Sequence, residues 1–107
     1  MAFYMYQVAY TPESLASQTR NLQNVVNRTK ALIESLGGKL VCTYYSFGEY
    51  DLLQIIEYPD NVSAASHAIV AASGGAVKAS KITPLMTVEE GSEAFLKAVA
   101  ARYAPPV

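Results

Sequence analysis

The residues best able to carry chemistry lie at the start of an apolar segment in the middle of the chain. Tyr50 and Asp51 follow the turn residue Gly48, and the segment then runs from Leu52 to Glu57 with apolar residues on both faces. A strand of this kind is buried from both sides, so its polar ends are where a site can form. Asp51 and Tyr50 are therefore the candidate catalytic residues, with Asp51 as base or polar anchor. In the alternative, Asp51 hydrogen-bonds the turn backbone and Tyr50 only packs.

Three glutamines supply further polar candidates. Gln7 and Gln54 lie inside otherwise apolar strands, and Gln18 lies within the apolar stripe of a predicted helix. Their amides either pair inside the protein, Gln7 with Gln54, or contact a ligand. The predicted ligand-binding residues are four polar or aromatic side chains and one glycine: Gln7, Gln18, Tyr44, Gly48 and Gln54.

The other reactive side chains do not favour a metal or haem site. His67 is the only histidine and Cys42 the only cysteine, which is too few for an ordinary zinc site. The inward stripe predicted for helix 62–73 includes Ala65 and Ile69 and turns His67 outward, away from any haem. Cys42 lies in mid-strand without a partner base, as a core residue does. We expect no metal and no cofactor.

The elements that must position these residues alternate in a regular order. Thr11 and Pro12 begin a helix that is predicted to run unbroken to Gly37, and Thr87 and Glu90 have the spacing of a capping box. The predicted order is strand 3–10, helix 11–37, strand 39–47, strand 50–58, helix 62–73, strand 76–83 and a final helix to about 102.

This order is a strand-helix-strand unit used twice, which is typical of an α+β ferredoxin-like fold (βαββαβ) with an added C-terminal helix. Its usual form is a four-stranded antiparallel sheet with two helices on one face. We expect one domain, residues 1–103, followed by a flexible tail, residues 104–107.

The apolar content predicts self-association. Of the 107 residues 51% are apolar and only 16% are charged, against a usual value of about 25% charged. Both faces of the first and third strands are apolar, so the face without helices needs a cover. Two sheets packed face to face would bury it, which predicts a homodimer of the dimeric α/β-barrel type. A charge introduced at Val8 or Ile56 is expected to disrupt it.

Charge and hydropathy limit the other partners. Eight basic and nine acidic residues give a net charge of −1 without a basic run, so nucleic-acid binding is not expected. No stretch approaches the roughly 20 apolar residues of a membrane span, and no signal-peptide pattern opens the chain. We expect a cytoplasmic protein that does not enter membranes.

One short motif resembles a known family. Gly48, Glu49, Tyr50 and Asp51, followed by an apolar strand, Pro59 and an Ala-rich helix, are similar to the GYD domain family, which is named for its Gly/Tyr/Asp motif. Gly48, Tyr50 and Asp51 match the naming residues.

The resemblance covers nearly the whole chain, from the first strand and the helix start at Thr11 and Pro12 to the capping box that begins at Thr87. It implies a ferredoxin-like subunit within the dimeric α/β-barrel superfamily. The family is largely uncharacterised, so the resemblance supplies no function. Wider relatives include cofactor-independent monooxygenases, haem-binding enzymes and small isomerases or decarboxylases, and these are analogies of fold.

The residues and the resemblance together predict a homodimer that binds a hydrophobic small molecule between helices and sheet. Such a protein could be a cofactor-independent enzyme. Because no strong catalytic constellation is present, the alternative is a non-catalytic dimeric interaction or regulatory module.

Overall fold

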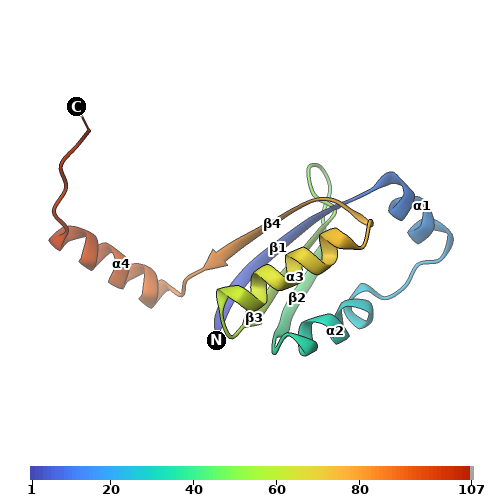
Figure 1. Cartoon of the computed structure of the whole chain (residues 1–107), viewed down its shortest axis with the longest axis horizontal. Helices are drawn as coiled ribbons and strands as arrows, with labels where there is room; N and C mark the ends of the chain where they lie inside the picture. Colours follow the sequence, from blue (N-terminus) through green and yellow to red (C-terminus); the bar gives the residue numbers. More distant parts are fainter. Residues whose placement is uncertain (107) are drawn as a thin grey trace.

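The computed structural model describes residues 1–106, so Val107 of the predicted tail lies outside the described residues. The elements follow the order β1 (Ala2–Tyr10), α1 (Pro12–Arg20), α2 (Val25–Ser35), β2 (Lys39–Tyr45), β3 (Leu52–Tyr58), α3 (Asn61–Ser73), β4 (Val77–Leu85) and α4 (Val88–Ala100). The strands form one antiparallel sheet in the order β2-β3-β1-β4, with β2 and β4 at its edges (Figure 1). The predicted ferredoxin-like fold is confirmed.

The two faces of the sheet are covered differently. Helices α2 and α3 pack on one face, where Tyr4, Tyr6 and Val8 of β1 are at most 3% exposed (Figure 1). The alternate residues of β1, such as Met5, lie on the uncovered face and are half-buried. Side chains of a strand alternate between faces, so the central strands β1 and β3 place apolar residues on both faces of the sheet.

Two residues that were predicted to lie in the dimer interface are on the covered face instead. Val8 and Ile56 are 2% and 1% exposed and belong to the core under the helices. The prediction that they report on a sheet-to-sheet interface is therefore wrong. Both strands are apolar on both sides, so hydropathy alone could not tell which side the helices cover.

The predicted single helix before β2 is two helices. α1 ends at Arg20, because the backbone of the next residue, Asn21, leaves the helical region (φ −145°, ψ 77°), and α2 starts after Asn24. The side chain of Asn24 accepts a hydrogen bond of 3.1 Å from the backbone N–H of Asn27, so Asn24 is the N-cap of α2. The apolar spacing continues across the break, and this continuity concealed it.

The inward stripe predicted for α3 is also wrong. α3 begins after Asp60, whose carboxylate accepts a hydrogen bond from the N–H of Ser63. Its buried residues are Ala64 and His67, whereas Ile69 is 68% exposed. Alanine occurs on all sides of this helix, so hydrophobicity did not fix which side faces the sheet.

Close packing begins where α2 meets the sheet. A side chain on Gly38 would place its Cβ 2.7 Å from the Cδ1 atom of Tyr58, so only glycine fits beside this buried ring.

At the other edge of the sheet, β4 does not stop before Pro84, as predicted, but continues to Leu85. Proline is tolerated there because β4 is an edge strand.

The last helix stands apart from the rest. The predicted capping box is present, since Thr87 and Glu90 exchange hydrogen bonds of 3.0 and 3.1 Å. α4 then extends away from the sheet and lengthens the molecule to 56 Å by 34 Å by 22 Å (Figure 1). No helix of the described residues is both long enough and apolar enough to span a membrane.

Candidate functional site

A cavity of about 230 Å³ lies between the covered face of the sheet and the first three helices. Its walls come from β1, β3, the start of β4, and from α1, α2 and α3. The lining is mostly apolar, with a few polar groups: Tyr6, Val8, Tyr10, Ser14, Arg28, Thr29, Leu32, Leu52, Gln54, His67, Ala71, Ala76 and Val77. An apolar hollow with a few convergent polar groups is the usual form of a small-molecule site.

Two polar atoms of this cavity wall have no hydrogen-bond partner among residues 1–106. They are the hydroxyl of Tyr6 and the side-chain oxygen Oε1 of Gln54, and both are out of contact with bulk solvent. Tyr6 and Gln54 are direct cross-strand partners of β1 and β3, so their side chains leave the sheet side by side on the covered face. Burial raises the pKa of Tyr6 to about 12, so its hydroxyl keeps its proton.

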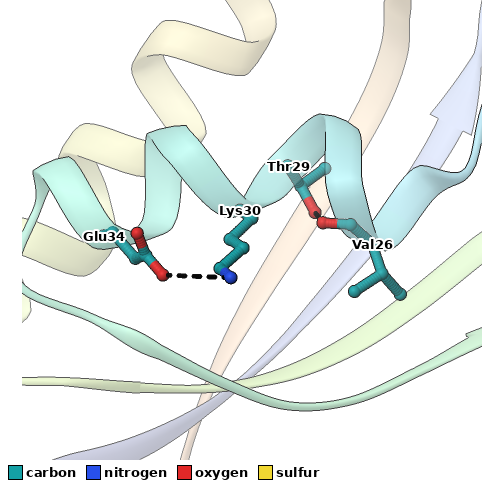
Figure 2. A network of polar contacts seen from close by, with 4 residues as sticks. All are labelled: Val26, Thr29, Lys30 and Glu34. Carbon is teal, nitrogen blue, oxygen red and sulfur yellow. Dashed lines mark hydrogen bonds and ion pairs between the residues drawn. The ribbon is translucent and has the colours of Figure 1, made fainter.

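The amide of Gln54 is held on its nitrogen side only. Its Nε2 donates hydrogen bonds of 3.1 Å to Thr29 of α2 and 3.2 Å to Thr43 of β2. The hydroxyl of Thr29 in turn donates to the carbonyl of Val25 at 2.9 Å and lies near that of Val26 (Figure 2). This chain of contacts fixes the orientation of the amide and leaves Oε1 as a free acceptor.

His67 and Tyr58 form a buried pair beside Tyr6. The Tyr58 hydroxyl lies 2.5 Å from Nδ1 of His67, and the ring of Tyr6 is centred 4.5 Å from the imidazole. Burial lowers the pKa of His67 to about 4 and raises that of Tyr58 to about 12. Both groups are therefore uncharged at neutral pH, so His67, which lines the cavity, adds no charge to its wall.

The side chain of Arg28 places a positive charge at the mouth of the cavity. Nη2 of Arg28, on the exposed side of α2, donates a hydrogen bond of 3.0 Å to the hydroxyl of Tyr10. Burial raises the pKa of Tyr10, and the nearby Arg28 opposes this rise. The cavity thus has an uncharged interior and one positive charge at its entrance. Among the described residues, no three His, Cys, Asp or Glu side chains come together as metal ligands.

The predicted catalytic residues lie at the end of this cavity wall, in the β2–β3 hairpin. Oδ2 of Asp51 accepts a hydrogen bond of 2.9 Å from the backbone N–H of Tyr10, and the N–H of Asp51 donates to the carbonyl of Val8 at 2.7 Å. Asp51 therefore joins the hairpin to the end of β1. The Tyr50 carbonyl accepts from Ser46 at 2.7 Å. A catalytic role for Asp51 and Tyr50 stays a prediction.

The structure separates the predicted ligand-binding residues. Gln54 lines the cavity, whereas Gln7 and Tyr44 pair with Leu53 and share the uncovered face of the sheet. Gln7 and Gln54 thus lie on opposite faces, and the predicted pairing between them is wrong. Gln18 donates a hydrogen bond of 3.1 Å to Ser14 on α1.

Gly48 sits at the tip of the hairpin with φ +111°, a backbone angle that favours glycine. Its position there is that of a turn residue, and a Cβ added to it would meet no other atom within 4 Å. The backbone angle, and not a lack of space, is therefore what calls for glycine at this position. Its predicted ligand contact stays a prediction.

Sequence reasoning missed most residues of the cavity, among them Tyr6, His67 and Arg28. Tyr6 could have been found, because strand alternation places it on the face of β1 that carries Tyr4, Val8 and Tyr10. His67 could not, because its orientation depends on the phase of an alanine-rich helix. Arg28 could not either, because its place at the cavity depends on the break between α1 and α2, which was not predicted.

Comparisons with known proteins agree with the fold. The family model described as the GYD domain matches residues 4–95. No curated protein matches the chain. Among solved structures, the chain resembles 30S ribosomal protein S6 from Thermotoga maritima, with a TM-score of 0.59 and 15% identity over 89% of this chain and 97% of that one.

Two further solved structures are similar. FFRP-DM1 gives a TM-score of 0.57 at 15% identity, over 80% of this chain and 100% of that chain. MtbAldR gives 0.55 at 16% identity, over 80% of this chain and 52% of that one. At such low identity these likenesses concern the fold alone.

Proposed function

We propose that this chain, which belongs to the GYD domain family, acts as a homodimer that binds a small, uncharged, largely apolar molecule. The ligand lies in the cavity between the helices and the covered face of the sheet. The domain works in the cytoplasm, which fits its single unpaired cysteine, Cys42.

The observation that carries the proposal is the pair of unpartnered atoms in the cavity wall. A buried polar atom without a partner costs about 1–3 kcal/mol, so such atoms are rare unless something else satisfies them. The Tyr6 hydroxyl offers a donor and Gln54 Oε1 offers an acceptor. A ligand hydroxyl or amide can accept from the first and donate to the second after a small side-chain movement.

The size and charge of the cavity define the ligand further. A volume of about 230 Å³ is below the range of roughly 300–1,000 Å³ that is usual for drug-sized ligands. It suits a molecule of one or two rings. The uncharged His67 in the cavity wall favours a neutral molecule, and Arg28 at the mouth of the cavity tolerates a partial negative charge at the outer end of the ligand.

The proposed dimer buries the uncovered face of the sheet. Leu53, Ile55 and Met5 lie there side by side on β3 and β1, half-buried and without a helix over them. A patch of this kind is unusual on a monomer and typical of an association surface. The alternative, a non-catalytic dimeric interaction module, is supported by the same patch but leaves the two unpartnered atoms unexplained.

The substitution Tyr6→Phe tests the binding proposal. Removing a hydroxyl that has no protein partner should leave the free energy of unfolding unchanged or slightly higher. It should weaken the binding of a probe such as 2-naphthol about fivefold, because one hydrogen bond is worth about 1 kcal/mol. Binding is measured by the fluorescence of the probe, and stability by urea unfolding.

Tyr4→Phe is the matched control. The Tyr4 hydroxyl donates a 2.6 Å hydrogen bond to Oδ1 of Asn61, outside the cavity. This variant should lose about 1 kcal/mol of stability and keep full binding. If both variants bind the probe as the wild type does, the cavity is not the ligand site. Native mass spectrometry of the protein purified from its own host then reports any retained ligand together with the subunit count.

A further inference from the structure

Helix α4 presents an apolar face that no other element of the described residues covers to any extent. Phe95, Leu96 and Val99 recur at helical spacing and are 78%, 73% and 85% exposed. Polar residues, among them Glu90 and Lys97, occupy the opposite side. A two-sided helix held away from its own sheet has its apolar face free for a partner surface.

A complementary surface exists at the far edge of the sheet. A groove of about 440 Å³ runs between α2 and the edge strand β2. Its apolar lining includes Val26 and Val41, which are 42% and 51% exposed. Figure 2 shows Val26, Lys30 and Glu34 together on α2, and all three line this groove.

We propose that α4 of one copy docks into the α2–β2 groove of a second copy, and that the second copy returns the same contact. This proposal rests on the homodimer in the proposed function and adds a second interface to it. The partner is thus a second copy of this chain, and the docked segment is residues 88–100.

The lengths of the two surfaces agree. α4 has 13 residues, which makes it about 20 Å long at 1.5 Å per residue. β2 has seven residues, which span about 23 Å at 3.3 Å per residue. The helix can therefore lie along the strand over its whole length.

Charge is complementary at the rim of the groove. Lys30 and Lys39 line the groove together with Glu34. On α4, Glu89 and Glu93 lie beside Leu96 at one side of the apolar face, and Glu93 makes an exposed contact of 3.9 Å with Lys97. Among residues 1–106 of one copy, the ion pair of Lys30 is an exposed contact of 3.9 Å with Glu34 (Figure 2). Such a pair is weak, so Lys30 can exchange it for a carboxylate of the docked helix.

The chain cannot place α4 along its own groove. β4 and β2 are opposite edges of the sheet, three strand spacings or about 14 Å apart. Only Met86 and Thr87 connect Leu85 to Val88, and these three steps span at most about 11 Å. The two-fold symmetry of a homodimer removes this obstacle, because each copy offers its groove to the helix of the other.

A disulfide between Val41→Cys and Leu96→Cys tests the docking. Both are introduced together in a Cys42→Ser background, so that no native thiol competes. On oxidation, the non-reducing gel should show a covalent dimer, whereas each single-cysteine variant should remain largely monomeric in mass. Loss of both thiols without a change of mass would mean that α4 folds back on its own chain, and would overturn the proposal.

Native mass spectrometry distinguishes a failure of the α4 docking from a failure of the homodimer itself. A dimer that forms no disulfide would overturn the docking and leave the homodimer intact, whereas a monomer would overturn both.

An exchange of charges between the two surfaces supplies an independent test of the docking. Lys30→Glu and Glu93→Lys should each raise the dimer dissociation constant about fivefold, and the double variant should restore it. Failure of the double variant to restore dimerisation contradicts the predicted contact.

Discussion

The two faces of this sheet are built from the same strands and are both apolar, yet they solve different problems. On the covered face, the side chains of Tyr4, Tyr6 and Val8 are at most 3% exposed, sealed by the protein's own helices. On the uncovered face, Met5 and Ile55 stay half-buried with no helix above them. The first face therefore holds the fold together, and the second is available for association.

The polar groups follow the same division. The covered face contains a buried histidine and a glutamine with one free acceptor, Gln54 Oε1, around a small cavity. The uncovered face carries Gln7 and Lys81 as cross-strand partners, which keep contact with solvent. Hydropathy is similar on the two faces. The uncovered face also holds one buried polar atom without a partner among residues 1–106, the hydroxyl of Thr83 beside Met5, so the two faces differ in how far water reaches them.

Neighbouring residues of β3 offer the sharpest test of this difference. Ile56 is 1% exposed on the covered face, and Ile55 lies beside it on the uncovered face. Ile56→Asp should leave no folded protein, because an unpaired buried carboxylate costs more than about 4 kcal/mol. Ile55→Asp should keep the fold and abolish the dimer.

Circular dichroism and size-exclusion chromatography distinguish these results. A folded Ile56→Asp variant would contradict the assignment of the covered face. An Ile55→Asp variant that still elutes as a dimer would show that the uncovered face is not the interface. If both variants unfold alike, the two faces do not differ in the way described.

Much of the fold could be predicted because its signals are local. The capping box of Thr87 and Glu90, the proline after Thr11 and the alternation of β1 each depend on a few adjacent residues. These fixed the order of elements and with it the ferredoxin-like topology. The break at Asn21–Asn24 was missed because its caps compete with an apolar spacing that runs through it.

The site was harder to predict because it depends on helix phase. In α3, alanines lie on every side, so the sequence did not tell whether His67 or Ile69 faces the sheet. The packing of α3 over Tyr6 and Tyr58 decides this, and these contacts are far apart in the sequence. Only Gln54, a polar residue in an apolar strand, was both predicted and found at the cavity.

The substitution Gly38→Ala tests how tightly the side chains of the covered face are packed around Tyr58. In Gly38→Ala, the new Cβ would lie 2.7 Å from Cδ1 of Tyr58 and 2.9 Å from the Glu57 carbonyl oxygen. Tyr58 is 1% exposed and bonded to His67, so the ring cannot easily move. We expect a loss of about 3 kcal/mol in the free energy of unfolding, measured in urea.

Gly74→Ala is the control for this substitution. Gly74 has φ −79°, and the nearest atom to its added Cβ is 3.6 Å away, an ordinary contact. Its stability should change by no more than about 0.5 kcal/mol. Equal losses in the two variants would mean that a general glycine effect, and not the Tyr58 ring, limits the packing.

The smallest expected effect is a dependence of stability on pH through His67. Burial lowers its pKa from 6.5 to about 4 in the folded protein, so the unfolded chain binds more protons between these values. Stability is then complete above pH 6.5 and falls as the pH drops toward 4. With these two pKa values, linkage gives a loss of about 2 kcal/mol between pH 7.5 and pH 5.

His67→Gln isolates this contribution, because glutamine does not titrate in the same range. Urea unfolding at pH 7.5 and pH 5 should give a difference about 2 kcal/mol smaller for this variant than for the wild type. The lowered pKa of Asp60 acts below its ordinary value of 3.8 and does not enter this window. Equal pH dependence in both proteins would place His67 in contact with water, and the covered face would then not be sealed as described.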